Sequence, residues 1–203
     1  MSLALPFTED QRDCLQEISN VAMGAAGEKL AEFSNVFVEL SIPVVRTIDL
    51  QDLVDALVSL QGVEAVSGVV QPFEFGAVSG CALVAITESS FRDLAQQRDV
   101  TIENDEGAQA LLVQLAETIT HTCLPMLAEQ LDVEAPVLAA AEVASLHVPL
   151  AEFNIPQVAS WTRLNTVEIN YHLEGHPFNC DLLLMLPDSA SVALAAKLES
   201  LLA

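Results

Sequence analysis

The sequence has very few basic residues for its length. Its 203 residues include 7 Lys and Arg against 29 Asp and Glu, which gives a formal net charge of −22 at pH 7. A surface of this charge repels phosphate backbones and anionic lipid headgroups. The sequence therefore argues against binding to nucleic acids or to a membrane surface, and it favours attraction to a locally basic partner.

Long apolar runs and closely spaced cysteines are also absent. No segment approaches the roughly 18 consecutive apolar residues that a membrane span requires, and the N-terminus lacks the positive region that begins a signal peptide. The cysteines are widely scattered, with no Cys-x-x-Cys pair: Cys14, Cys81, Cys123 and Cys180. This usage is typical of reduced core residues, and we expect a cytoplasmic protein.

Apolar residues are abundant, at 52% of the chain, which excludes general disorder. Their spacing predicts both helices and strands. We expect helices at about 8–33, 50–60, 89–97, 107–130 and 188–203, the first opened by a capping box at Thr8-x-x-Gln11 and the last capped by Asp188 or Ser189. We expect strands at 36–42 (half-buried), 63–70, 77–86, 137–146, 162–172 and 178–186, with 71–76 as a connection.

The second half of the chain repeats features of the first at an offset of 100 residues, as the pair Leu83 and Leu183 illustrates. The order of predicted elements is also the same in both halves, which indicates a duplication. We therefore expect one α+β domain over residues 1–203, with pseudo-repeats at about 1–100 and 101–203 and a continuous sheet covered by helices.

One face of the first predicted helix carries unusual residues. Asp13, Glu17, Asn20, Gly24 and Gly27 lie within about 80° of one another on a helical wheel, opposite the apolar stripe. Asn is a poor helix former, and each glycine costs up to about 1 kcal/mol relative to Ala. Such a face is either an ordinary solvated surface or a flat ridge that another protein can approach closely.

The spacing Asp13-x3-Glu17-x2-Asn20-x22-Pro43 follows the signature of the CheC/CheX/FliY phosphatases of bacterial chemotaxis. The segments around these residues also resemble that family, and the two repeated halves resemble CheC more than the shorter CheX. The resemblance implies a CheC-like α+β fold with pseudo-two-fold symmetry. In such a fold, long helices pack on a continuous, mostly antiparallel sheet.

The resemblance also implies an activity, the hydrolysis of the aspartyl-phosphate on a CheY-type response regulator. In this interpretation Asn20 positions the attacking water, because a neutral amide accepts its hydrogen bond without adding negative charge near the phosphoryl oxygens. Glu17, one turn earlier, docks beside the active-site lysine of the regulator. Asp13 and Gly24 are supporting or docking residues, and Pro43 is structural. The chain then needs no cofactor or metal of its own, since Mg²⁺ belongs to the regulator.

The second half departs from this signature. Glu117 is present, but Thr120 stands where the family has Asn, and Val113 stands at the acidic or Ser position. Pro125 lies within the predicted helix, and we expect it to kink or break the helix there. The sequence therefore predicts a weak or inactive second site at Glu117 and Thr120, and one working centre.

The histidines give no strong indication of a metal or catalytic site. His172 and His176 flank a predicted turn, a geometry that rarely suits zinc. We expect His121 to be a hydrogen-bonded, partly buried side chain and His147 to be a loop residue. We expect no metal site in this chain.

Two other functions stay open from the sequence. Domains of related fold in flagellar switch proteins resemble the family but lack its Glu/Asn pair, so the chain is alternatively a non-catalytic interaction module. Some family members also bind the receptor deamidase CheD, which is a further candidate partner. The last alternative is a homodimeric scaffold whose long helices pair. The sequence does not identify which response regulator is recognised.

Overall fold

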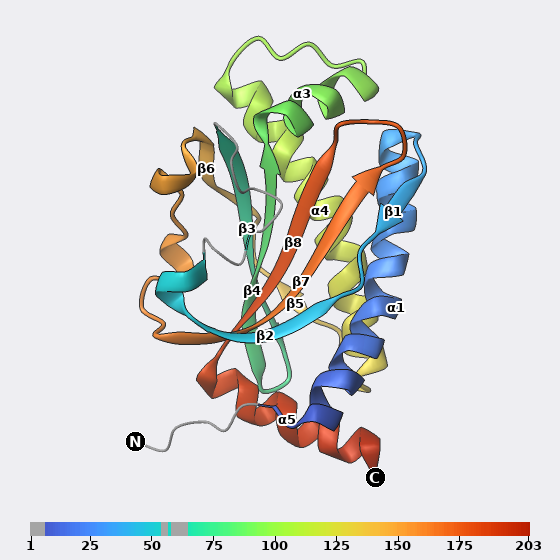
Figure 1. The fold of residues 1–203 in the computed structure, drawn as a ribbon, viewed down its shortest axis with the longest axis vertical. Coiled ribbons are helices and arrows are strands. Elements are labelled where there is room, and N and C mark those ends of the chain that lie inside the picture. The colour runs from blue at the N-terminus through green and yellow to red at the C-terminus, as the bar shows by residue number, and fades with distance from the viewer. Residues whose placement is uncertain (1–6, 54–56, 58–64) are drawn as a thin grey trace.

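A computed structural model gives the fold of residues 7–53, 57 and 65–203. Figure 1 shows its elements, which follow the chain in this order: α1 (Glu9–Ser34), β1 (Val38–Leu40), β2 (Val44–Asp49), η1 (Leu50–Asp52), β3 (Val66–Phe75), β4 (Val78–Thr87), α3 (Glu88–Gln97), α4 (Asp105–Gln130), β5 (Val137–Leu138), β6 (Glu142–Val148), η3 (Leu150–Glu152), η4 (Pro156–Val158), β7 (Arg163–Leu173), β8 (Asn179–Pro187) and α5 (Asp188–Leu202). Most of the helix predicted at 50–60 lies outside the described residues.

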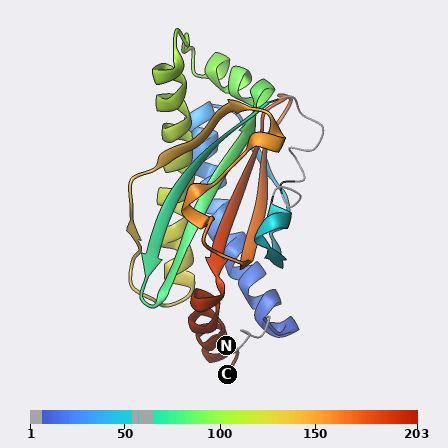
Figure 2. The ribbon, with the colours of Figure 1, turned by 90° about the vertical axis from the view of Figure 1, so that its left-hand side faces the viewer.

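The described strands form one sheet in the order β1-β7-β8-β4-β3-β5, with β2 also paired to β7 and β6 to β3. Every pair is antiparallel. Figures 1 and 2 show α1 and α4 side by side on one face of this sheet, with α3 and α5 at its opposite ends. The chain thus has the predicted α+β fold, an antiparallel sheet with long helices packed on it.

The two halves of the chain exchange strands. β1 and β2 from the first half pair with β7 of the second, while β5 and β6 from the second half pair with β3 of the first. At the centre of the sheet β4 pairs with β8, and Leu83 lies directly opposite Leu183. Because neither half completes its own part of the sheet, the strands of both halves form one continuous structure.

Apolar side chains are buried on both faces of the sheet. The larger cluster lies between the sheet and the helices and includes Leu15, Leu30, Leu115 and Leu182. A smaller cluster lies on the opposite face, where residues such as Phe153 in the segment around η3 and η4 cover it. Burial on both faces explains why the central strands are nearly continuous apolar runs.

The predicted capping box begins α1. Thr8 accepts a hydrogen bond from the backbone N–H of Gln11 at 3.2 Å, and Gln11 Oε1 accepts one from the Thr8 N–H at 3.0 Å. The helix ends where Asn35 adopts a left-handed conformation, with φ of 56°. The chain reverses there, so that β1 returns alongside α1 and contacts it.

The first predicted strand, 36–42, is shortened to β1 in the structure, and β2, which was not predicted, follows it. Leu40 of β1 pairs with Tyr171 of β7, and Val44 of β2 pairs with Glu168 of β7. The segment that joins β1 to β2 is therefore one residue longer than the part of β7 opposite it. A one-residue bulge exchanges the two faces of a strand. The alternation favours Leu40 and Ile42 as inward-facing residues, but their side chains are 40% and 73% exposed.

Two other strand boundaries differ from the prediction. Residues 71–76, predicted as a connection, continue β3 as far as Phe75, and the hairpin turns at Gly76, whose φ is 58°. Pro72 is tolerated inside β3 because it lies beside the break between β5 and β6, where the ladder is interrupted. The same break divides the strand predicted over 137–146.

The predicted break of the second long helix at Pro125 does not occur, since α4 continues to Gln130. The flanking residues Leu124 and Leu127 are buried in the core. Pro125 removes one backbone hydrogen bond from α4, but the packing of the buried apolar side chains around it outweighs this loss. Tertiary packing supplies most of the stability of helices in proteins.

The side-chain cap predicted for the last helix is wrong. Pro187 occupies the N-cap position of α5, and no side chain caps the helix there. Asp188 instead accepts a hydrogen bond from Arg163 at 3.3 Å, and this contact uses the carboxylate that was expected to cap.

Of the described helices, α4 alone is long and apolar enough to cross a membrane by length and composition. Half of that apolar stretch is buried inside the protein. It contacts α1, β3 and β6. The position of α4 in the protein core therefore explains why it is so apolar.

Candidate functional site

The residues of the predicted site lie on the outer face of α1. Asp13, Glu17, Asn20 and Gly24 form what we call the α1 ridge. The first three are exposed, and Gly24 is partly exposed. Glu17 and Asn20 lie one turn apart on the same side, about 4.5 Å along the helix axis. Among the described residues, neither side chain has a hydrogen-bond partner.

The opposite side of α1 fixes the orientation of the ridge. This side is buried against α4 and β7. Its fully buried apolar residues are Leu15, Ala22, Met23, Ala26 and Leu30. Rotation of the helix would expose these residues to water, so the polar side chains of the ridge are held outward.

The two glycines of this helix differ in their surroundings. A Cβ atom placed on Gly27 would lie 3.2 Å from Cδ2 of Leu40, so β1 packs closely against the helix at this point. A Cβ atom placed on Gly24 would meet nothing within 4 Å. Gly24 therefore leaves the surface of the ridge low and open beside Asn20.

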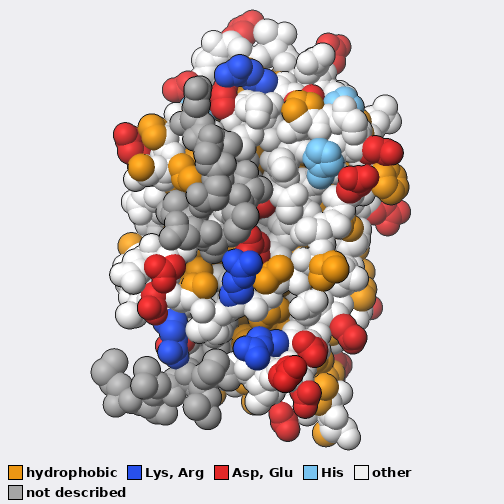
Figure 3. Space-filling view, viewed as in Figure 1, with side chains coloured by type: hydrophobic (Ala, Val, Ile, Leu, Met, Phe, Trp, Pro, Cys, Tyr) orange, Lys and Arg blue, Asp and Glu red, His pale blue; other side chains and the backbone are white. Residues whose placement is uncertain are grey.

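Most basic side chains are engaged within the protein and do not offset the charge of the ridge. Arg98 lies over the ring of Phe33, with 4.4 Å between Cζ and the ring centroid. Five others form ion pairs with carboxylates: Lys29, Arg46, Arg92, Arg163 and Lys197. Arg12, which lies on α1 just before Asp13, is exposed. In Figure 3 acidic and hydrophobic side chains gather along the margin formed by α1 and β1, and a basic side chain lies beside the acidic ones near its lower end. The ridge is therefore in a negative local field.

The thiol next to the ridge is poorly suited to act as a nucleophile. Burial raises the pKa of Cys14, and the Glu17 carboxylate raises it further. Burial also raises the pKa values of Cys81 and Cys123 to about 12. All four cysteines are free thiols, as predicted. Their neutral form is favoured, and a neutral thiol is a poor nucleophile.

The corresponding position on α4 faces the protein interior. Thr120 is 1% exposed, and its hydroxyl bonds to Oε1 of Gln71 and lies 2.8 Å from the carbonyl of Ala116. Gln71 also donates from Nε2 to His121 at 3.1 Å. Glu117 is partly exposed. The structure therefore does not bring Glu117 and Thr120 together on an open surface.

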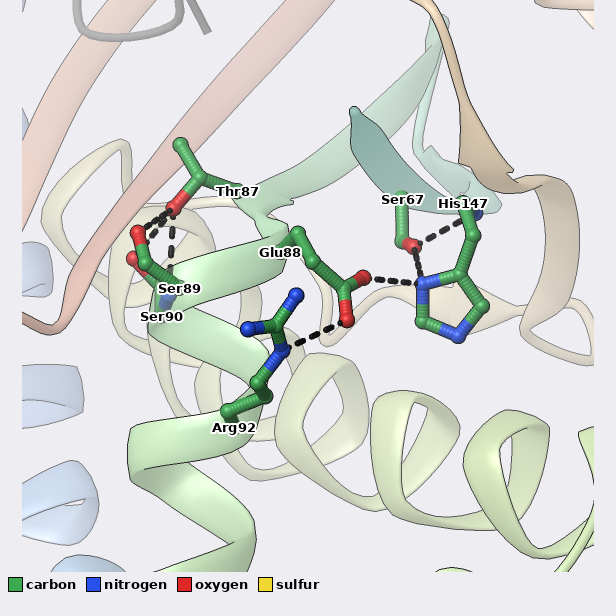
Figure 4. A network of polar contacts seen from close by, with 7 residues as sticks. All are labelled: Ser67, Thr87, Glu88, Ser89, Ser90, Arg92 and His147. Carbon is green, nitrogen blue, oxygen red and sulfur yellow. Dashed lines mark hydrogen bonds and ion pairs between the residues drawn. The ribbon is translucent and has the colours of Figure 1, made fainter. Parts of the chain in front are cut away.

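A polar cluster that the sequence analysis missed joins β3, β6 and α3 (Figure 4). Nδ1 of His147 lies 2.5 Å from Glu88 and 3.5 Å from Oγ of Ser67. In a catalytic Ser-His-Glu triad the serine and the carboxylate contact different ring nitrogens. Here both contact Nδ1, so the cluster is a structural junction. No local motif connects these residues, which are distant in the sequence.

Two histidines differ from the prediction, and the first is His121, which is hydrogen-bonded as expected but is exposed and not partly buried. His147 is not a loop residue, because it lies within β6, where its φ is 52°. His172 Nδ1 lies 2.9 Å from the Phe178 carbonyl, and His176 Nδ1 lies 2.8 Å from Nε2 of Gln97. Within the described residues, no three His, Cys, Asp or Glu side chains are grouped to hold a metal ion.

No protein-family model and no curated protein matches the sequence. Solved structures do match its fold. FliY from Thermotoga maritima aligns with a TM-score of 0.72 at 16% identity, covering 97% of this chain and 99% of that one. The FliM middle domain from H. pylori gives 0.63 at 13% identity, covering 94% and 99%.

CheX from Desulfovibrio desulfuricans aligns with a TM-score of 0.56 at 13% identity, covering 84% of this chain and 99% of that one. The TM-scores and the coverage establish a shared fold, whereas identities of 13–16% do not establish a shared activity, which must be argued from the site itself. The particular preference for CheC stays a prediction. The chain has the fold of the CheC/CheX/FliY chemotaxis proteins, which it shares with the FliM middle domain.

Proposed function

We propose that this chain is a phosphatase that hydrolyses the aspartyl-phosphate of a CheY-type response regulator in bacterial chemotaxis. The α1 ridge is its one working centre, and the cytoplasm is where it meets its partner. The observation that carries the proposal is the exposure of Glu17 and Asn20 on one side of a helix whose other side is buried. The signature-like spacing of Asp13, Glu17, Asn20 and Pro43 and the fold shared with FliY and CheX support it.

The chemistry required of the ridge is modest. An acyl phosphate is already activated, so catalysis consists mainly of placing a water in line with the phosphorus atom. Asn20 accepts a hydrogen bond from this water through Oδ1. The water oxygen forms a bond to phosphorus as the aspartyl carboxylate leaves, and the water proton passes to the released phosphate. Mg²⁺ is held by the regulator, so no step requires a metal on this chain.

Glu17 has a separate role in this proposal. Its carboxylate would repel the phosphoryl group, so it must contact a cation. The regulator's active-site lysine is such a cation, and an ion pair with it sets the register in which Asn20 reaches the phosphorus. Asp13 extends the same negative surface by one turn, and Gly24 leaves room for close approach.

The second candidate is a non-catalytic interaction module, and the alignment with the FliM middle domain favours it. FliM structures of this fold include complexes with FliG and with SpeE, both from H. pylori. In this alternative Glu17 and Asn20 only dock. It predicts binding that is indifferent to phosphorylation and leaves the lifetime of the regulator's phosphate unchanged.

The deciding experiment is phosphate release from a panel of phosphorylated receiver proteins. Asn20→Ala is expected to lower turnover on the order of 10²-fold or more. Asn20→Asp should fail as well, because it adds negative charge at the same place. Gln114→Ala, which removes an exposed amide from α4, is the matched control and should retain full activity. Turnover by Asn20→Ala equal to that of the unaltered protein would contradict the proposal.

A further inference from the structure

Exposed apolar side chains gather along the margin formed by α1 and β1. Ten large apolar residues are markedly exposed in the described part of the chain, and four of them lie within the eight-residue stretch from Phe37 to Val44. A fifth, Val21, is 50% exposed on α1 next to Asn20. Scattered apolar residues on a surface are ordinary, but a group on one margin indicates an interaction surface.

Part of this group directly flanks the α1 ridge. We call Val21, Leu40 and Ile42 the apolar flank. Leu40 packs against Gly27, so β1 lies against the ridge side of the helix. Ile42 is two residues further along a chain that runs back beside α1, and β2, which follows, also contacts α1. Val21 lies on the other side of Asn20 on the helical wheel.

The charges around the flank indicate what covers it. The exposed residues beside it include Asp13, Glu17, Glu28 and Glu39. We call these exposed carboxylates the acidic frame of the flank. The basic residues of α1 are Lys29, which is bound to Glu32 at 2.8 Å, and Arg12, which is exposed beside Asp13, so acidic residues outnumber them along this surface. A second copy of this chain, which also has a net charge of −22, would place its own acidic frame against this one, and the repulsion would weaken binding. A partner with apolar side chains inside a rim of Lys and Arg complements the surface.

We propose that the apolar flank is the docking surface that seats the phosphorylated response regulator on the α1 ridge, an inference that rests on the proposed function. The flank supplies affinity by burying apolar surface, and the acidic frame supplies orientation. Asn20 contributes to the hydrolysis step and not to affinity. The regulator face that fits this surface presents apolar side chains framed by basic residues, and this determines which receiver is accepted.

The test separates binding from turnover. Ile42→Asp is compared with Val137→Asp, because Val137 is also a β-branched residue with 72% exposure and lies on β5, at the other end of the sheet order. For a receiver that the unaltered protein dephosphorylates, Ile42→Asp is expected to raise KM about 10-fold or more and change kcat less than 2-fold. Val137→Asp should change neither. Affinity of the unaltered protein should also fall as NaCl is raised from roughly 50 to 500 mM, because the contact is charge-complementary.

Four results would overturn the inference. If Ile42→Asp leaves KM unchanged while Asn20→Ala is inactive, the apolar flank is not a docking surface, but the proposed function is still supported. An equal rise of KM in both aspartate variants assigns the effect to added charge. A dimer in sedimentation that Ile42→Asp dissociates shows a second copy on the flank. If no receiver is bound or dephosphorylated, the proposed function fails and this inference fails with it.

Discussion

Gly24 illustrates how one residue serves the surface of the protein at a cost to its helix. A glycine in the interior of a helix lowers stability by roughly 0.5–1 kcal/mol relative to alanine. Internal packing does not require this glycine, since an added Cβ would have no neighbour within 4 Å. The open space above Gly24 is therefore available to an approaching partner.

Substitution of Gly24 should separate stability from docking. Gly24→Ala is expected to raise the free energy of unfolding by about 0.5–1 kcal/mol, measured by urea denaturation. The same variant should raise KM for the phosphorylated regulator, because a methyl group then stands beside Asn20. Gly27→Ala is the comparison, and it should gain less stability because its Cβ meets Leu40 at 3.2 Å. A loss of stability in Gly24→Ala would contradict this account.

At the scale of single elements, the two long helices show how similar sequence patterns acquire different roles. α1 leaves Asn20 exposed, whereas α4 buries Thr120 beneath β3 and bonds it to Gln71. The Thr120 hydroxyl satisfies Gln71, and a larger amide at this buried position would have to displace its neighbours. The difference between the helices is therefore one of burial as much as of residue type.

Restoring the family's amide in α4 should not create a second centre. Thr120→Asn is expected to lower the free energy of unfolding by about 1–3 kcal/mol, because the larger side chain overpacks a buried site. The double variant Asn20→Ala/Thr120→Asn should remain inactive in the phosphate-release assay. Gln114→Asn, at an exposed position of α4, controls for the lower helix propensity of asparagine. Phosphatase activity in the double variant would show that the side chain can reach the surface.

Sequence patterns predict some elements of this protein well and others poorly, for identifiable reasons. The long helices and the β7 and β8 strands were predictable because periodicity and caps such as Thr8 are local signals. β2 was missed, because its residues are largely exposed and show no alternation of apolar and polar side chains. The place of Pro72 within β3 was also missed, because its tolerance depends on where β5 and β6 separate.

The candidate site was predictable to a similar, partial extent. Glu17 and Asn20 lie close in the sequence, so their shared helical face follows from spacing alone. The contact of Thr120 with Gln71 and the junction of Glu88 with His147 join segments 49 and 59 residues apart. No local pattern records such contacts. They depend on strand register, which tertiary packing determines.

At the scale of the whole molecule, the exchange of strands makes the halves mutually dependent. Residues 1–100 contain β3 without β5 and β6, and residues 101–203 contain β7 without β1 and β2. An isolated half would expose the edges of these strands and the apolar faces beside them.

Separation of the halves therefore gives a clear prediction. Fragments 1–100 and 101–203, produced alone, are expected to show no cooperative thermal unfolding by circular dichroism. Mixed in equal amounts, they should regain strand structure, because each supplies the strands that the other lacks. A cooperative transition in either fragment alone would contradict the dependence.

The register of β4 against β8, with Leu83 facing Leu183, has a consequence for the history of the chain. A residue that meets its own counterpart across an antiparallel pair is what a symmetric homodimer has on its rotation axis. Fusion of two identical ancestral protomers through the link between α3 and α4 would leave this arrangement. Once the protomers were covalently joined, selection could act on each copy separately, and one helix could lose its exposed amide while the other kept it.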